Sequence, residues 1–144
     1  NRCVEKDNLL NTLDDLGLGS IAFTPLAQGM LTNKYLNKIP SESRAAQGKS
    51  LAQDKITPQL IQTLNDLNQI AANRGQSLAQ MALSWVLRNG RVTTALIGAS
   101  KPEQIEDCVG AVNNLEFSNE ELLHIDAITS DQDINLWAKS SEIS

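Results

Sequence analysis

The stretch of sequence that decides the fold is ALIGASKPE, residues 95–103. Its apolar run ends at Gly98, which predicts a short β-strand after which the chain exits the sheet. A helix start follows, because Ser100 is a favoured N-cap, Glu103 completes a capping box, and Pro102 lies in the first turn. The free amides of this helix and the positive end of its dipole then point at the strand exit, where they can bind an anion such as phosphate. Taken alone, the stretch is more simply explained as a strand-to-helix turn without a ligand.

Composition is typical of a globular domain. The chain has 144 residues, of which 41% are hydrophobic and 20% charged, and no apolar run approaches the ~20 residues of a membrane helix. The net charge of −5 argues against a nucleic-acid surface. Cys3 and Cys108 have no metal-ligand spacing, and no secretory signal is present, so we expect a reduced cytoplasmic protein without a metal site or a membrane partner. The start at Asn1, without a methionine, predicts a fragment or a processed chain.

Positive charge gathers in one segment of this acidic chain. Against the single anion Glu42, residues 30–50 carry four cations, namely Lys34, Lys38, Arg44 and Lys49. Such a patch suits a small anionic ligand. A solvated loop whose cations only keep it soluble is the commoner explanation for any one lysine, and both explanations stay open.

Hydrophobic periodicity and helix-end signals predict an alternation of helices and strands. The expected elements are a helix at 6–16, a buried strand at 21–23, a long loop from 25 to about 55, helices that begin after Thr57 and Ser77, a strand at 93–97, and helices at 102–113 and 119–128. Gln80 follows Ser77 by three residues, and Glu121 likewise follows Ser118, so both pairs predict capping boxes.

Strands that are separated by helical crossovers predict a parallel sheet. Two strands alone would leave open apolar edges, so we expect this chain to be the end of a larger α/β protein. In a (β/α)8 barrel the loops after strands seven and eight commonly bind phosphate, and here those exits are the basic loop and the turn at 98–100. The predicted fold is therefore α/β: the C-terminal portion of a TIM barrel, strands seven and eight with their helices, an incomplete barrel forming part of one domain over residues 1–144.

Three motifs resemble the aldo-keto reductase family. FTPLAQGMLTNKY, residues 23–35, resembles the loop after strand seven, and the stretch from 96 to 108 resembles the strand-eight exit with the last barrel helix. GQSLAQMALSW, residues 75–85, resembles the helix before strand eight. The resemblance covers essentially the whole chain. It is closest to the branch that holds potassium-channel beta subunits and bacterial L-glyceraldehyde 3-phosphate reductases.

The resemblance implies that the first strand exit holds the nicotinamide and pyrophosphate of NADPH. Phe23 stands where the family places an aromatic ring against the nicotinamide. The loop that wraps the pyrophosphate corresponds to Thr24, Pro25, Leu26, Ala27 and Gln28. Without the resemblance, Phe23 is more simply a core residue at the end of a strand.

The same resemblance assigns the remaining cofactor contacts. The residues implied to contact phosphates are Lys34 and Arg44 in the basic segment and Gly98, Ser100 and Gln104 at the second strand exit. Asp107 and Cys108 replace the usual Glu and Asn of the family, which bind the adenine amine. A thiol is a poor hydrogen-bond partner compared with an amide, whereas Asp107 can still accept from the amine.

No catalytic residue can be assigned in this chain, because the family takes its Asp, Tyr, Lys and His from the first half of the barrel. Tyr35 belongs to the cofactor loop, and His124, the only histidine, is expected at the surface. The favoured hypothesis is an NADPH-dependent aldehyde reductase whose N-terminal half supplies the catalytic groups. An enzyme that resembles L-glyceraldehyde 3-phosphate reductase is the narrower form of this hypothesis. The alternatives are a non-catalytic, cofactor-binding regulatory subunit and a piece that is inert alone. The expected partners are a small-molecule aldehyde and the rest of the barrel, and a homo-oligomer stays open.

Overall fold

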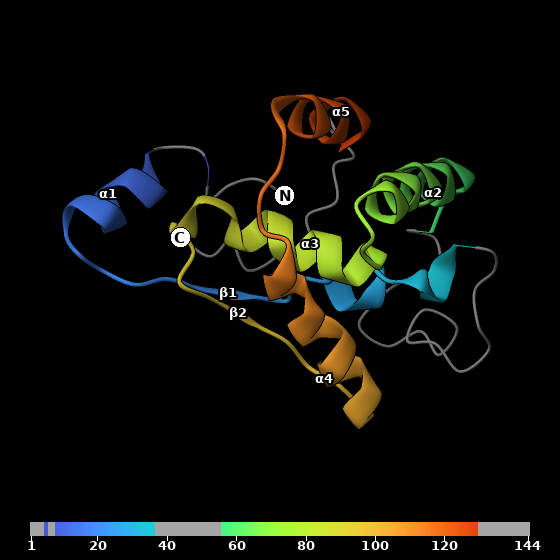
Figure 1. Cartoon of the computed structure of the whole chain (residues 1–144), viewed down its shortest axis with the longest axis horizontal. Helices are drawn as coiled ribbons and strands as arrows, with labels where there is room; N and C mark the ends of the chain where they lie inside the picture. The colour runs from blue at the N-terminus through green and yellow to red at the C-terminus, as the bar shows by residue number, and fades with distance from the viewer. Residues whose placement is uncertain (1–4, 6–7, 37–55, 130–144) are drawn as a thin grey trace, which may run out of the picture.

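The computed structural model describes residues 5, 8–36 and 56–129. The described elements are α1 (Leu9–Asp15), β1 (Ile21–Phe23), the 3-10 turns η2 (Ala27–Gly29) and η3 (Asn33–Tyr35), α2 (Pro58–Asn73), α3 (Leu78–Leu87), η5 (Arg88–Gly90), β2 (Thr94–Leu96), α4 (Pro102–Val109), η6 (Gly110–Asn113) and α5 (Asn119–Thr129) (Figure 1). The predictions for Cys3, Lys38, Arg44 and Lys49 concern positions outside the described residues.

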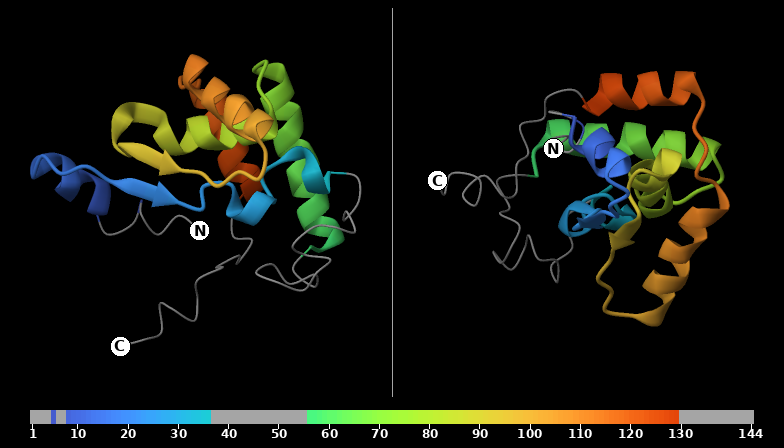
Figure 2. Two further views of the ribbon diagram at one scale, coloured as in Figure 1. Left: turned by 90° about the horizontal axis from the view of Figure 1, so that it is seen from below. Right: turned by 90° about the vertical axis from the view of Figure 1, so that its left-hand side faces the viewer.

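The two strands form a parallel pair, as the alternation of strands and helices predicts. Ile21 lies opposite Thr94, and Phe23 lies opposite Leu96. Figure 2 shows α3 and α4 to one side of this pair. On that side Ala95 packs against a small apolar cluster contributed by α3, α4 and η6. The parallel pairing and the position of the helices confirm an α/β architecture for the described residues.

The other face of the strand pair is open, and here the prediction of a buried strand is wrong. Ile21 and Phe23 are 68% and 59% exposed, and Leu96 is 61% exposed. Side chains alternate between the faces of a strand, so a sheet that is covered on one side leaves every second residue uncovered. The apolar composition of β1 therefore predicted its strand character correctly but not its exposure within this chain.

The main hydrophobic core lies between α2, α3 and α5. It includes the α2 stripe Leu60, Leu64, Leu67 and Ala71, with Leu78 and Met81 from α3 and Ile125 from α5. The α2 positions recur every three or four residues, which places them on one helix face. By contrast, α1 has no buried residue, although its leucines recur with the same spacing.

Side-chain caps fix three helix starts where the sequence predicts them. Thr57 Oγ1 accepts from the backbone N–H of Leu60 at 3.1 Å, with Pro58 in the first turn of α2. Ser77 and Gln80 make both bonds of a capping box at α3. At α5, Ser118 Oγ accepts from the Glu121 amide and the Ser118 amide donates to the Glu121 carboxylate, at 3.1 and 2.7 Å.

The start of α4 differs from the prediction. Lys101 is the N-cap, and its side chain makes no capping bond, so the predicted box between Ser100 and Glu103 is wrong. Pro102 has a φ suited to the first helical position, which places the N-cap one residue after Ser100. Gln104 reaches back instead, and its Oε1 accepts from the N–H of Ser100 at 2.8 Å and from its hydroxyl at 3.3 Å.

Candidate functional site

The candidate site lies at the carboxyl ends of β1 and β2. The register pairs Phe23 with Leu96, the last residues of the two strands, so the chain segments that follow them start at one edge of the sheet. Those segments are the loop from Thr24 and the turn from Ile97 to Ser100 (Figure 1). Ligands of parallel α/β sheets bind at this edge.

The loop after β1 has an unusual backbone. Within the described part of the chain, positive φ occurs at five non-glycine residues, and three of them are Thr24, Ala27 and Gln28, at 54°, 47° and 59°. Such conformations are uncommon, most of all for the β-branched Thr24, and each costs of order 1–3 kcal/mol. Local bonds hold the loop in this shape: the amides of Ala27 and Gly29 donate to the carbonyls of Thr24 and Leu26, both at 2.9 Å. Clustered strain of this kind favours a functional loop over a passive connection.

Residues further along anchor this loop to the core. Thr32 Oγ1 donates to the carbonyl of Gly29 at 2.7 Å and accepts from the N–H of Lys34 at 3.3 Å. Tyr35 is 1% exposed and packs in the main core. Asn65 of α2 donates from Nδ2 to the carbonyl of Leu36 at 3.2 Å. The exposed Lys34 is therefore carried on a backbone that is fixed on both sides.

At the second exit the structure brings Ser100 and Gln104 together. The N–H and the hydroxyl of Ser100 both point at one acceptor, the amide oxygen of Gln104. Both residues are exposed, as is Gly98 before them. A phosphate oxygen accepts from the same kinds of donor, and it gains from the positive end of the α4 dipole. The exit can therefore bind an anion if Gln104 moves aside.

Asp107 and Cys108 lie on different sides of α4. The Asp107 carboxylate is at the surface, where it accepts from Gln80 Nε2 at 2.9 Å and from Ser77 Oγ at 3.1 Å. The Cys108 side chain is 9% exposed and packs against the apolar cluster with Leu83. Burial, and then the negative charge of Asp107, raise the pKa of the Cys108 thiol above its usual range. Of the two, Asp107 is the one that presents a polar group to solvent.

Sequence reasoning missed the second role of the α3 capping box. Ser77 and Gln80 were expected only to start α3, but both also hold Asp107 of α4. The local motif gives the signal for the cap, whereas the contact with Asp107 spans 27 to 30 positions and has no local signature.

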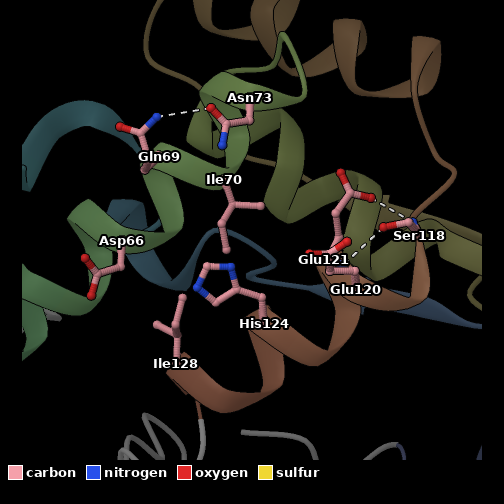
Figure 3. Close-up of a pocket in the computed structure, with 9 residues that line it drawn as sticks. All are labelled: Asp66, Gln69, Ile70, Asn73, Ser118, Glu120, Glu121, His124 and Ile128. Carbon is pink, nitrogen blue, oxygen red and sulfur yellow. Dashed lines mark hydrogen bonds between the residues drawn. The ribbon is translucent and has the colours of Figure 1, made fainter.

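A separate cavity of about 350 Å³ lies between α2 and α5, away from the strand exits (Figure 3). Its walls include Asp66, Ile70, Glu120, His124 and Ile128. His124 is exposed, as the sequence predicts. Within residues 5, 8–36 and 56–129, no group of three His, Cys, Asp or Glu side chains is placed to hold a metal ion. Nor does this part of the chain contain a helix with the length and apolar character to cross a membrane.

Comparison with known proteins identifies the family. The sequence profile described as "Aldo/keto reductase family" matches residues 1–130, and the chain belongs to this family. It is 51% identical over 146 aligned positions to L-glyceraldehyde 3-phosphate reductase of Escherichia coli strain K12, an alignment that covers 99% of this chain and 42% of that protein. The chain thus spans less than half the length of the curated relatives that it matches at this identity. The family match confirms that the chain resembles the aldo-keto reductases, as its motifs predict.

Two further relatives are informative. A Schizosaccharomyces pombe protein assigned as a voltage-gated potassium channel beta subunit is 38% identical over 123 positions, which cover 83% of this chain and 36% of that protein. Among solved structures, the glycerol dehydrogenase of Gluconobacter oxydans superposes with a TM-score of 0.68 at 27% identity, covering 89% of this chain and 38% of that chain. The TM-score of 0.68 shows that the chain shares the fold of that structure over the aligned part.

Proposed function

We propose that this chain is the cofactor-binding C-terminal part of an NADPH-dependent aldehyde reductase. In this proposal β1 and β2 are strands seven and eight of a TIM barrel whose other strands belong to the same domain. One observation carries the proposal: the strained loop at 24–28 and the turn that carries Ser100 follow two parallel strands that end at the same sheet edge. The 51% identity to the E. coli reductase makes L-glyceraldehyde 3-phosphate, or a related small aldehyde, the proposed substrate.

The residues at the strand exits fit an anionic dinucleotide. When Gln104 moves aside, Ser100 offers an N–H and a hydroxyl to a phosphate. The exposed Lys34 offers a fixed positive charge beside the loop. Phe23 presents an aromatic ring, 59% exposed, at the end of β1. Asp107 is proposed to accept from the adenine amine, and Arg44, outside the described residues, to bind a phosphate. When bound, NADPH supplies the hydride that reduces a carbonyl carbon.

The group that protonates the carbonyl oxygen is proposed to come from the preceding part of the barrel. The family resemblance gives none of the residues assigned above that role, and Tyr35 is buried in the core. General acid catalysis contributes roughly 10²–10⁴-fold to such reactions, so the 144 residues alone should reduce aldehydes at no appreciable rate. We also propose that the complete protein works in the cytoplasm.

A non-catalytic subunit that binds the same cofactor is the second candidate. The 38% identity to the S. pombe protein assigned as a channel beta subunit favours it. Such a subunit would use the same strand exits and the same residues for the cofactor, so the described part of the chain fits both candidates. The two differ in whether the complete barrel turns over an aldehyde.

The deciding experiment measures NADPH binding and aldehyde turnover in the full-length protein. Protein fluorescence reports binding, and cofactor absorbance reports turnover with L-glyceraldehyde 3-phosphate and with glyceraldehyde. Binding with turnover supports the reductase, and binding without turnover of either aldehyde supports the regulatory subunit. Absence of NADPH binding contradicts both, and turnover by the isolated 144 residues contradicts the proposal that the acid lies elsewhere.

A further inference from the structure

Gln80 connects the start of α3 with the surface of α4. Its Oε1 accepts from the backbone N–H of Ser77 at 3.0 Å. Its Nε2 donates to both the backbone carbonyl and Oδ1 of Asp107, at 2.9 Å each. Ser77 completes the network. Its hydroxyl accepts from the backbone N–H of Gln80 at 3.2 Å and donates to Asp107 Oδ2 at 3.1 Å. Each carboxylate oxygen of Asp107 is thus held by a different α3 side chain.

The space that Gln80 occupies depends on Gly110. A Cβ at position 110 would lie 2.5 Å from Gln80 Nε2 and 3.3 Å from its Cδ. Gly110 has an ordinary right-handed conformation, with φ of −55°, so its backbone does not require glycine. The missing side chain instead leaves room for the amide of Gln80 to reach Asp107.

The held carboxylate still has acceptor capacity. A carboxylate offers about four lone-pair sites in all, and the two bonds from α3 leave the others available. Asp107 is exposed, and it lies one turn after Gln104, on the same face of α4 as that residue. An exposed aspartate otherwise rotates among several conformers, so bonds to both oxygens fix the direction of its remaining lone pairs before a ligand arrives.

We propose that Gln80 is a positioning residue for adenine recognition, acting through Asp107. It fixes the Asp107 carboxylate so that this group accepts a hydrogen bond from the 6-amine of the cofactor's adenine. The protein would then select adenine over a purine that carries oxygen at position 6, because that oxygen cannot donate and would face a carboxylate. This inference rests on the proposed NADPH site and adds to it the residues that set its base selectivity.

The test uses the full-length protein with the substitution Gln80→Glu. Glutamate at this position still accepts from the Ser77 amide, so the capping box of α3 persists. It has no donor for Asp107, and it places a second negative charge beside that carboxylate. Gly110→Ala displaces the side-chain amide of Gln80 by steric contact with the new Cβ, and it keeps glutamine at position 80 and aspartate at position 107.

Gln62→Glu is the matched control. Gln62 Nε2 also donates to an aspartate, Oδ1 of Asp66 at 2.8 Å, but within α2. The measured quantity is the ratio of the dissociation constants for NADPH and its hypoxanthine analogue, in which oxygen replaces the 6-amine.

In the wild-type protein we expect NADPH to bind roughly ten- to hundredfold more tightly than the analogue, the size of one hydrogen bond to a charged group. Gln80→Glu and Gly110→Ala should both bring the ratio close to one by weakening the binding of NADPH. Gln62→Glu should keep the wild-type ratio. A wild-type ratio of one, an unchanged ratio in both variants, or equal weakening of both dinucleotides would each overturn the role of Gln80. Absence of NADPH binding by the wild type would overturn the proposed function together with this inference.

Discussion

Arg74 Nη1 lies 2.8 Å from Glu121 Oε2, and this ion pair joins the end of α2 to the first turn of α5. Arg74 Nη2 also donates to the carbonyls of Asn114 and Glu116, at 3.2 and 2.8 Å. The guanidinium stacks on the ring of Phe117, 3.7 Å from its centroid. Because the Arg74 side chain is only 4% exposed, its charge depends on these partners rather than on water. The segment between α4 and α5 is thereby held against the turn between α2 and α3.

Replacing this arginine should cost much of the protein's stability. We expect Arg74→Ala to lower the free energy of unfolding of the full-length protein by about 1–3 kcal/mol, because it removes the donor to the carbonyls of Asn114 and Glu116 and the ion-pair partner of Glu121, whose carboxylate keeps its bond from Ser118. Urea unfolding followed by circular dichroism measures the change. Arg91→Ala is the control, since Arg91 is exposed, and surface substitutions usually stay within about 0.5 kcal/mol. Equal losses in the two variants would contradict the role given to Arg74.

The same ion pair predicts a dependence of stability on pH. Burial alone would raise the pKa of Glu121, but the hydrogen bonds from Ser118 and Arg74 and the charge of Arg74 outweigh it and lower the pKa below its usual value of 4.5. A lowered pKa in the folded state adds stability above pH 4.5, and this contribution is lost as the pH falls through the folded-state pKa. The stability difference between wild type and Glu121→Gln should therefore be largest near neutral pH and shrink below pH 4.5 in urea titrations. A difference that does not shrink as the pH falls below 4.5 would contradict this prediction.

Local signals predicted most of the described elements. The capping residues Thr57, Ser77 and Ser118 begin their helices as expected, because a cap is satisfied by amides three residues away. The prediction of Ser100 as the N-cap of α4 was wrong, because Ser100 and Pro102 are both helix-start signals and they place the N-cap at different residues. The structure shows that the helix starts at Pro102. The exposure of Phe23 depends on which elements cover the sheet, and no residue close to it in sequence determines that.

The candidate site was less accessible to sequence reasoning than the fold. Spacing and glycines located the two strand exits, and the family resemblance supplied the roles of the residues there. The sequence does not predict the positive φ angles of Thr24 and Ala27, because threonine and alanine rarely adopt such angles. The contact of Gln80 with Asp107 joins positions 27 apart, which only the packing of α3 on α4 brings together.

Burial of Cys108 predicts slow reaction with alkylating reagents. The thiolate is the reactive form, and both burial and the neighbouring Asp107 raise the pKa of the thiol. Iodoacetamide at pH 8 should therefore modify Cys108 far more slowly in the native full-length protein than in the same protein unfolded in urea. Mass spectrometry of the digested protein locates and quantifies the label. Equal rates in the two states would show that the thiol is accessible and would contradict its place in the apolar cluster.

The basic segment predicts a preference for NADPH over NADH. A 2′-phosphate adds nearly two negative charges near neutral pH, and each charge-assisted hydrogen bond to it contributes roughly 1.5–3 kcal/mol. Losing one such bond weakens binding roughly ten- to hundredfold. We therefore expect Lys34→Ala and Arg44→Ala to weaken NADPH binding by the full-length protein by such factors, as measured by fluorescence titration.

Titration of NADH in the same two variants separates the roles of these cations. A residue that contacts the 2′-phosphate should leave NADH affinity nearly unchanged when it is replaced, because NADH lacks that group. A residue that contacts the shared pyrophosphate should weaken both dinucleotides equally. Lys34 is exposed and follows the strained loop closely, so its replacement tests whether the first strand exit binds a phosphate at all. Equal wild-type affinity for NADH and NADPH, unchanged by either substitution, would mean that these cations only solvate the loop.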